Sequence, residues 1–437
     1  MRPVFRQRPR RWTLAGLVAS ISLAGLATVA TAPPSSAAAS PASAIKHVVV
    51  MMQENRSFDS YLGQLPVSGQ PAADGEPAGA ANPNPANPSG PPITAFHQTR
   101  YCEVADLEHS WTGTHAEVGG GAMSGFTTAN VTSADPTGAR TMGYYTAADL
   151  PYYYSLYNTF AMGDRYFSSV QGPTFPNRFY LLAGTSFGHI QNDLAPLDGF
   201  TQRSIFNLLD EAKVSWKVYF SEIPFAAEFS YVRAHALGHL EPITQYYLDA
   251  ATGHLPQVSF VDPILIGPPS VENDEHPPSN VQVGEAFTAG VIGSLMHGPD
   301  WSSSALFLTY DEHGGFYDHV APPAAPVPDA IAPMLGTGDA AAAFDHYGVR
   351  VPAVVVSPYS RAHFVSHVVH DHTSILRFIE TRFGLPALTN RDAQADPMLE
   401  FFDFSHPSFA VPPKLAAAPV ALAPQLTCLL TLPSLGL

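Results

Sequence analysis

The chain has 437 residues, of which 46% are hydrophobic and 13% are charged, and its formal net charge at pH 7 is −16. Globular proteins average about 25% charged residues, so this chain is poor in charge. Its 42 prolines and 33 glycines favour long ordered loops over a helical bundle. The dense basic run lies between Arg2 and Arg11. Because nucleic-acid binding needs a basic face, we expect no nucleic-acid partner for the mature chain.

The first 39 residues have the pattern of a signal peptide. Arginines between Arg2 and Arg11 precede an apolar stretch at 14–30, and Ala37-Ala38-Ala39 follows as a cleavage pattern. The apolar run is short for a bilayer span. We therefore expect cleavage, a secreted or extracytoplasmic cell-envelope location, and no transmembrane anchor in the mature chain. The pair Arg10-Arg11 leaves both Sec and twin-arginine export open.

Two cysteines, Cys102 and Cys428, occur in the whole chain. Two thiols are too few for a structural zinc site built from cysteines alone. They can form a disulfide in an oxidising compartment, but the sequence leaves their pairing open.

Apolar strand patterns alternate with helical patterns along the chain. Strands are predicted at 45–52, 214–221, 258–261, 305–310 and 351–356, and helices at 204–213, 283–297 and 373–383. This alternation predicts an α/β fold with a central, mostly parallel sheet that is flanked by helices on both faces. We expect one catalytic domain at 40–409 and an apolar, proline-containing tail at 410–437.

Polar residues follow three of the predicted strands. Glu54-Asn55 follows the first, Asp262 follows the strand at 258–261, and Asp311-Glu312 follows the strand at 305–310. In α/β sheets, ligands bind beyond the carboxyl ends of the strands. Carboxylates gathered there repel one another unless a cation lies between them, so the sequence predicts a divalent metal site. In the alternative, these carboxylates cap helices or pair with arginines.

A turn rich in Gly and Pro precedes another predicted helix, and Thr174 lies at or near its N-cap. The N-terminus of a helix offers free N–H groups and a partial positive charge, which favour phosphate. Thr174 is therefore a candidate nucleophile, once a metal or a base lowers the pKa of its hydroxyl. Asn177 is a candidate donor to a phosphoryl oxygen. Capping of the helix is the alternative role of Thr174.

Several histidines lie in polar loops at expected helix starts. A histidine in such a place can protonate a leaving group or bind a metal, whereas an isolated loop histidine is more often solvated. The candidates for chemistry are His109, His276 and His372. His313 and His319 have a structural alternative, as supports for the Gly314-Gly315 turn.

Seven sequence blocks occur in order over residues 45–405. They are His47 to Asp59, His109-Ser110-Trp111, Gly163 to Phe167, Gly172 to Arg178, Glu275 to Pro278, Thr309 to Glu312, and Asp371 to Ser374. The first block includes Glu54-Asn55-Arg56-Ser57-Phe58-Asp59 directly after a strand and is the most specific of them. Together they resemble the bacterial phosphoesterase family that includes non-haemolytic and mycobacterial-type phospholipases C and a secreted acid phosphatase.

The resemblance implies an alkaline-phosphatase-like fold and a metal-dependent hydrolysis of phosphate esters. By position it implies that a divalent metal is bound by Glu54, Asn55, Asp311 and Glu312. It implies that Thr174 is the nucleophile, that it touches the metal and that it forms a phosphothreonine intermediate. His109, His276 and His372 match polar positions around the phosphate, and His276 is the candidate that helps the alcohol to leave.

Two departures from the family pattern leave the substrate open. His313-Gly314-Gly315 stands where phospholipase members usually have Asn-Asp-Gly, and the chain ends before the β-rich C-terminal domains of the large phospholipases. A phospholipase C that acts on a phospholipid headgroup at a membrane surface and an acid phosphatase therefore both remain, and a non-catalytic secreted binding protein is the alternative of another class. Carboxylate and amide ligands suit calcium, magnesium or manganese, while the histidines leave zinc or iron open.

Overall fold

Eight strands form the central sheet of the computed structural model, which describes residues 42–102, 105–267 and 271–419. The strands lie in the order β12-β6-β11-β10-β1-β9-β7-β8. Their bounds are β1 His47–Gln53, β6 Ala161–Gly163, β7 Trp216–Phe220, β8 Leu240–Pro242, β9 Val258–Asp262, β10 Ser304–Tyr310, β11 Ala353–Val356 and β12 Val365–Ser366. All pairings are parallel except those that β11 makes with β10 and β6, which are antiparallel. The prediction of a mostly parallel sheet is therefore confirmed.

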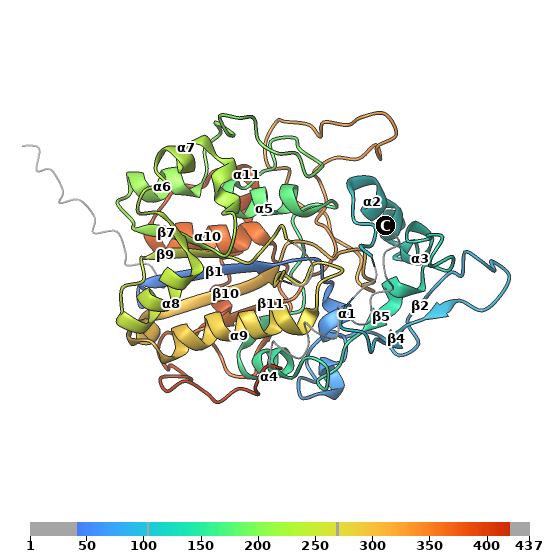
Figure 1. Ribbon diagram of the computed structural model, residues 1–437, viewed down its shortest axis with the longest axis horizontal. Helices are drawn as coiled ribbons and strands as arrows, with labels where there is room; N and C mark the ends of the chain where they lie inside the picture. Colours follow the sequence, from blue (N-terminus) through green and yellow to red (C-terminus); the bar gives the residue numbers. More distant parts are fainter. Residues whose placement is uncertain (1–41, 103–104, 268–270, 420–437) are drawn as a thin grey trace, which may run out of the picture. The chain divides into compact units, whose positions relative to one another are not determined.

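Helices cover both faces of this sheet, as predicted. Helices α5, α10 and α11 lie over one face, and α4 and α9 lie over the other (Figure 1). The helices are α1 Phe58–Leu62, α2 Trp111–Val118, α3 Phe126–Ala129, α4 Pro151–Thr159, α5 Thr174–Ala183, α6 Ile205–Glu211, α7 Ser230–Ala234, α8 Ile243–Thr252, α9 Val281–His297, α10 His372–Phe383 and α11 Asn390–Gln394.

Burial and helix capping account for the positions of several strands and helices. In β1, six of the seven residues are buried, as expected for a continuous apolar strand that is covered on both faces. Ser204 and Asn207 form a capping box that starts α6, and Asp371 and Ser374 form another that starts α10. Each predicted strand and helix is present, with its ends displaced by at most a few residues.

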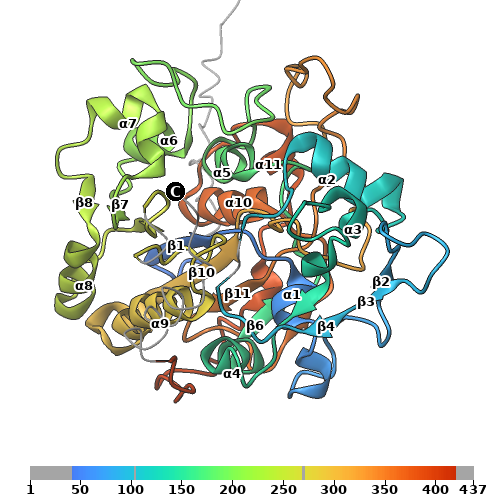
Figure 2. The ribbon, with the colours of Figure 1, turned by 45° about the vertical axis from the view of Figure 1, so that its right-hand side comes forward.

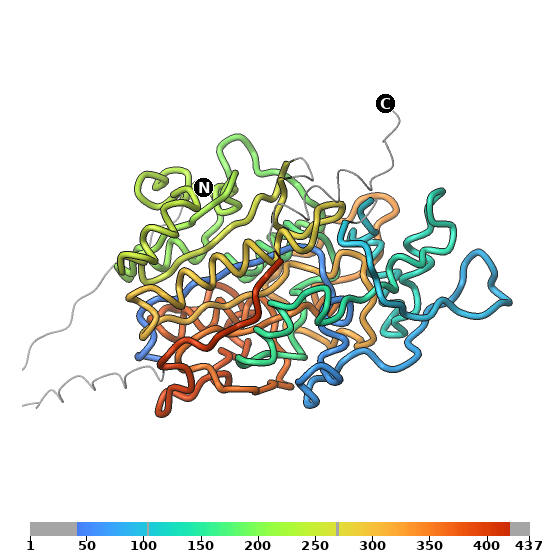
Figure 3. The backbone as a smooth tube through the Cα atoms, turned by 60° about the horizontal axis from the view of Figure 1, so that its bottom comes forward, coloured from blue at the N-terminus to red at the C-terminus, as the bar shows by residue number. Residues whose placement is uncertain are grey.

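The register of β1 places the predicted ligands side by side. Gln53 of β1 lies opposite Tyr310 of β10, and Met51 lies opposite Val261 of β9. The residues that leave the carboxyl ends of β1 and β10 therefore emerge next to each other. Figure 3 shows the blue segment that contains β1 running between segments from the second half of the chain.

The residues between α1 and α4 lie beyond the carboxyl end of β1 (Figures 1 and 2). They contain α2, α3 and four short strands, whose bounds are β2 Ala81–Asn82, β3 Ile93–Thr94, β4 Phe96–His97 and β5 Gly143–Tyr144. This segment carries His109 to the edge of the sheet where the strand-end carboxylates lie.

A close approach between two loops fixes the turn after Glu312. Gly314 has φ +63°, and a Cβ at this position would lie 2.5 Å from the carbonyl oxygen of Asn55. Glycine adopts this conformation without strain and leaves room for the neighbouring backbone. The turn thus holds the residues after β10 against those after β1.

Arg350 links these loops to the start of β11. The guanidinium is fully buried and lies 2.9 Å from Asp59 Oδ1 and 2.9 Å from Asp318 Oδ1, both of which are also fully buried. His319 Nδ1 lies 2.7 Å from Asp59 Oδ2. These contacts agree with a structural role for His319.

Some expectations fall on residues that the structure does not describe. The predicted signal peptide at 1–39, Cys428 and residues 420–437 of the predicted tail lie outside the described residues. Within the described part of the tail, the backbone N–H of Ala416 donates to Ser155 Oγ (3.0 Å). Among the described helices, none has the length and apolar character needed to cross a bilayer.

Replacing Arg350 with leucine should lower the free energy of unfolding by about 3–5 kcal/mol, because two buried carboxylates lose their partner. The matched control is Arg203→Leu, which removes an exposed ion pair with Glu211 and should change stability by less than about 1 kcal/mol. Urea unfolding of both variants measures the difference, and equal losses would contradict the assigned role of Arg350.

Candidate active site

Thr174 is the first residue of α5 and lies in a cavity. The extended residue Pro173 precedes it, so the helix begins at the threonine itself. Thr174 is 4% exposed. Together with Glu54 and His276, it lines a cavity of about 380 Å³. The structure thus brings together the predicted nucleophile, one predicted metal ligand and one predicted proton donor.

The start of α5 offers fewer N–H donors than the sequence predicts. The N–H of Phe175 donates to Asn192 Oδ1 (2.8 Å), and Pro176 has no N–H. The expectation that these positions present free donors to phosphate is wrong, because a residue from the following loop occupies the first one. Positive charge for a phosphate must come mainly from other groups.

The predicted ligand residues lie together at the carboxyl ends of β1 and β10. Glu54, Asn55, Asp311 and Glu312 are each at most 3% exposed. The N–H of Asn55 donates to Asp311 Oδ1 (3.1 Å), and the N–H of Arg56 donates to the carbonyl oxygen of Glu312 (3.0 Å). These contacts join the two strand ends into one polar cluster.

Several polar atoms of this cluster are buried and have no hydrogen-bond partner within the described chain. They are both amide atoms of Asn55, Oδ2 of Asp311 and Oε1 of Glu312. Buried polar atoms in native proteins nearly always have a partner, so such a concentration needs an explanation. Carboxylate and amide oxygens are the ligands that hard divalent cations prefer. The donor set therefore fits a divalent metal ion.

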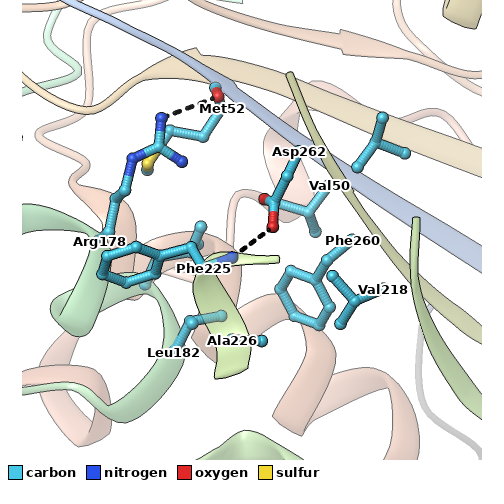
Figure 4. Close-up of a pocket in the computed structure, with 11 residues that line it drawn as sticks. Val50, Met52, Arg178, Leu182, Val218, Phe225, Ala226, Phe260 and Asp262 are labelled. Atoms are coloured by element: carbon cyan, nitrogen blue, oxygen red, sulfur yellow. Dashed lines mark hydrogen bonds between the residues drawn. The ribbon is translucent and has the colours of Figure 1, made fainter. Parts of the chain in front are cut away.

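Arg178 and His313 form ion pairs with these carboxylates, and His313 Nδ1 lies 3.4 Å from Glu312 Oε2. The Nη2 of Arg178 lies 2.9 Å from Glu54 Oε1, and its Nε lies 3.8 Å from Asp311 Oδ2. Figure 4 shows the guanidinium of Arg178 donating to the carbonyl oxygen of Met52. The ion pairs of Arg178 with Glu54 and Asp311 agree in part with the alternative in which these carboxylates pair with arginines.

The pKa values of the cluster reflect its burial and the charges next to each carboxylate. Burial raises the pKa of Glu54 to about 7, although Arg178 opposes the shift. Burial and the neighbouring Glu54 raise the pKa of Asp311 well above its usual value. Burial also acts to raise the pKa of Glu312, but His109 and His313 outweigh it and hold this pKa below its usual value. A divalent cation would favour the ionised form of all three carboxylates.

Asp262, at the end of β9, is not joined to this cluster by a hydrogen bond in the described chain. Its Oδ2 accepts the backbone N–H of Phe225 (2.9 Å), as Figure 4 also shows. Asp262 therefore anchors the turn before Phe225, which forms part of the cavity wall.

His109 and His276 lie next to each other at the edge of the site. Their ring centroids are 6.1 Å apart, and Asp106 lies within 3.7 Å of His109 Nδ1 and within 3.6 Å of His276 Nε2. Burial alone would lower the pKa of His109, but the carboxylates of Glu312 and Asp106 raise it to about 9. His109 is therefore positively charged near neutral pH and can attract an anionic substrate.

His372 supports the cluster from behind. Its Nε2 lies 2.7 Å from the carbonyl oxygen of Asp311, and its Nδ1 lies 3.3 Å from the hydroxyl of Tyr166. Burial lowers the pKa of His372 to about 3, so the ring is neutral at physiological pH. It donates a hydrogen bond to the Asp311 carbonyl and orients that residue.

Asn177 was predicted to donate a hydrogen bond to a phosphoryl oxygen, and its contacts contradict this prediction. Its Nδ2 donates to the carbonyl oxygens of Gly172 (2.9 Å) and Pro173 (3.1 Å), and its Oδ1 accepts the N–H of Val170 (3.0 Å). The amide is fully buried. These bonds use its donors, so donation to a phosphoryl oxygen is not available in this geometry. Asn177 instead fixes the turn that carries Thr174.

Three residues of the site were not predicted to have a role there. They are Arg178, Asp106 and Tyr166, whose contacts are given above. Arg178 and Tyr166 belong to two of the blocks that carry the family resemblance, but nothing in the spacing of these blocks indicates which way their side chains point. Asp106 occupies an ordinary position in a loop and carries no local signal.

Replacing Asn177 with alanine should lower the free energy of unfolding by several kcal/mol, because it leaves three buried backbone groups without partners at about 1–3 kcal/mol each. A residue that only donated to phosphate would leave stability unchanged. The matched control is Asn390→Ala, which removes an exposed amide that donates to the carbonyl oxygen of Val327. Thermal unfolding without ligand separates the two roles, and equal midpoints for both variants would argue against the positioning role.

Comparison with known proteins finds enzymes that share most of the chain. Phospholipase C B of Mycobacterium tuberculosis is 34% identical over 429 residues, which cover 85% of this chain and 80% of that protein. Non-specific phospholipase C1 of Arabidopsis thaliana is 34% identical and covers 87% of this chain and 75% of that protein. Non-hemolytic phospholipase C of Pseudomonas aeruginosa is 31% identical, and the match covers 83% of this chain and 58% of that protein.

Solved structures give more distant matches. A protein of the alkaline phosphatase superfamily from Vibrio parahaemolyticus has a TM-score of 0.38 at 9% identity, over 81% of this chain and 69% of that chain.

The sequence profile of the Phosphoesterase family matches residues 45–386. With this profile over most of its length and relatives that are at least 30% identical, the chain belongs to the Phosphoesterase family.

Proposed function

We propose that the chain hydrolyses phosphate esters in the manner of a phospholipase C, with Thr174 as the nucleophile and a divalent metal bound by Glu54, Asn55, Asp311 and Glu312. The observation that carries the proposal is the shared cavity: the hydroxyl-bearing Thr174 lines it together with Glu54 of the carboxylate cluster and with His276. Membership of the family makes the chain a phosphoric ester hydrolase, so a non-catalytic binding protein is no longer a competing interpretation.

A divalent cation held by the cluster supplies positive charge that lowers the pKa of a nearby hydroxyl and attracts phosphoryl oxygens. The chain's own residues prepare the site for this charge. Arg178 balances one carboxylate, and His372 fixes the backbone of Asp311. The remaining unpaired oxygen atoms on Asp311 and Glu312 are the ones available to a cation.

The proposed reaction uses Thr174 and His276. Thr174 releases its hydroxyl proton to solvent, its Oγ1 attacks phosphorus, the bond to the leaving alcohol breaks, and a phosphothreonine forms. His276 Nδ1 lies 2.6 Å from the carbonyl oxygen of Pro277, so Nδ1 carries a proton and Nε2 is the atom that exchanges one. Asp106 Oδ2 lies 3.6 Å from this Nε2, which donates its proton to the leaving oxygen. Water then attacks phosphorus and gives a proton to His276 Nε2. The bond to Thr174 Oγ1 breaks, the threonine takes up a proton again, and the phosphorylated product leaves.

The cavity favours an ester with an apolar leaving group over a phosphomonoester of a small polar alcohol. Its wall beside Thr174 contains Phe175, Pro224 and Phe225. This observation supports the phospholipase C assignment over the acid phosphatase alternative, and the relatives named above are phospholipases C. Export of the chain stays a prediction from the first 39 residues.

Replacing Thr174 with valine, which keeps the shape of the side chain, should lower turnover of a chromogenic phosphocholine diester by about 10³-fold or more, because the attacking oxygen is lost. Thr174→Ser keeps a hydroxyl and should retain turnover within about tenfold. Initial rates and thermal midpoints of both variants make the test. Near-normal turnover by the valine variant would exclude Thr174 as the nucleophile.

Treatment with a chelator should remove the activity, and a divalent cation should restore it. Asp311→Asn should weaken binding of that cation by about tenfold or more, since it removes one charge and alters a ligand. Asp262→Asn is the matched control, because this carboxylate also ends a parallel strand but bonds to the N–H of Phe225. Elemental analysis of the purified variants gives the metal content, and a loss in Asp262→Asn equal to that in Asp311→Asn would argue against the proposed ligand set.

A further inference from the structure

The cavity that Thr174 lines has two chemically different kinds of lining. Glu54, Thr174 and His276 are the lining residues assigned to the reaction. The same cavity is also lined by the apolar residues Leu194, Ile223, Leu265 and Ile266. A substrate that places its phosphate at Thr174 therefore shares the cavity with apolar side chains.

Three side chains of this wall also face solvent. Leu194 is 72% exposed, Ile223 is 52% exposed and Ile266 is 58% exposed. They come from three separate loops, which follow α5, β7 and β9. We call these three residues the apolar rim. Leu197, in the same loop as Leu194, is fully exposed as well. Single exposed apolar residues are ordinary, but a group of them around one cavity indicates a binding surface.

Polar contacts beneath the rim fix the loops that present it. The N–H of Ala195 donates to Glu228 Oε2 (2.7 Å), beside Leu194. The N–H of Ile266 donates to Glu222 Oε2 (3.2 Å), which links the loop of Ile266 to the turn of Ile223. The N–H of Phe225 is held by Asp262, as Figure 4 shows. Hydrogen bonds thus fix the backbone at or next to the residues of the rim.

The charges around the cavity favour an uncharged apolar group as its occupant over an anionic one. Glu228 and Glu272 line it, and none of the described residues that line it is a lysine or an arginine. A second anionic group on the substrate would be repelled there, whereas an uncharged apolar group would be accepted. The formal net charge of −16 likewise disfavours a strongly anionic surface as the partner.

The size of the cavity explains why an apolar rim surrounds it. Its volume of about 380 Å³ lies at the lower end of the range of about 300–1,000 Å³ for small-molecule pockets. A cavity of this size holds the glycerol and the first carbons of two acyl chains, and leaves the remaining carbons outside. Those carbons need an apolar surrounding, which a lipid layer in contact with the rim provides.

We propose that the cavity receives the glycerol end of a zwitterionic phospholipid, and that Leu194, Ile223 and Ile266 enter the lipid layer from which the substrate is taken. The inference rests on the proposed hydrolysis at Thr174 and adds the surface at which it takes place. The rim replaces water around the acyl chains while the phosphate lies at Thr174.

The test compares two substrates that have the same headgroup. One is long-chain phosphatidylcholine in vesicles, and the other is a soluble chromogenic phosphocholine diester. In the triple variant Leu194→Ser, Ile223→Ser, Ile266→Ser, the ratio of the vesicle rate to the soluble rate should fall by about tenfold or more, since three apolar contacts with lipid are lost. The matched control changes three exposed valines that lie outside the cavity: Val67→Ser, Val327→Ser, Val411→Ser. Its ratio should stay within about twofold of the wild-type ratio.

The outcomes separate this inference from the proposed function. If the unmodified chain hydrolyses both substrates and the ratio is the same in the rim variant and in the valine control, the lipid contact is wrong while the hydrolysis stands. An equal loss on both substrates also overturns the lipid contact. If the unmodified chain hydrolyses neither, the proposed function fails. Sedimentation of the full chains with the same vesicles then decides the lipid contact alone: weaker binding by the rim variant than by the control supports it, and equal binding overturns it.

Discussion

Negative charge buried at the carboxyl ends of two adjacent parallel strands is the constraint on which the site depends. Glu54, Asp311 and Glu312 lie in a part of the sheet that is covered on both faces and shielded from water. Charges in such a place are costly unless other groups compensate them. Arg178, His109 and His313 compensate part of the charge, while burial raises the pKa values of Glu54 and Asp311. The divalent cation proposed above would compensate the negative charge that remains.

A further buried carboxyl group, that of Glu275, holds the loop that carries His276. Glu275 has φ +77°, a conformation that non-glycine residues seldom adopt. Its side chain accepts hydrogen bonds from the hydroxyls of Tyr153 in α4 and Tyr310 in β10. Since Tyr310 is directly followed by Asp311, the same strand end positions a metal-ligand candidate and, through Glu275, the candidate acid. The proposed metal ligand Asp311 and the proposed acid His276 are in this way both held by the end of β10.

The sequence predicted those parts of the site that depend on local order along the chain. Glu54 and Asp311 follow apolar strands, and parallel strands bring their carboxyl ends to one edge of the sheet, so this cluster was predictable. The actual partner of the Asn177 amide was not, because the turn folds back onto it from Val170 to Pro173. The hydrogen bond from the N–H of Phe175 to Asn192 at the start of α5 was equally unpredictable, since it depends on how a loop packs. The neutral state of His372 follows from burial, which no spacing rule gives.

The antiparallel direction of β11 places different groups at the two ends of the sheet. Because β11 runs against β10, its beginning lies at the end where β1 and β10 finish, and Arg350 reaches Asp59 from there. The residues that leave β11 emerge at the opposite end, beside the segments that enter β1 and β10. Loops at that far end contain none of the groups assigned to chemistry or to lipid contact. They are where a fused protein, an affinity tag or an evolutionary insertion can be added with the least effect on the reaction.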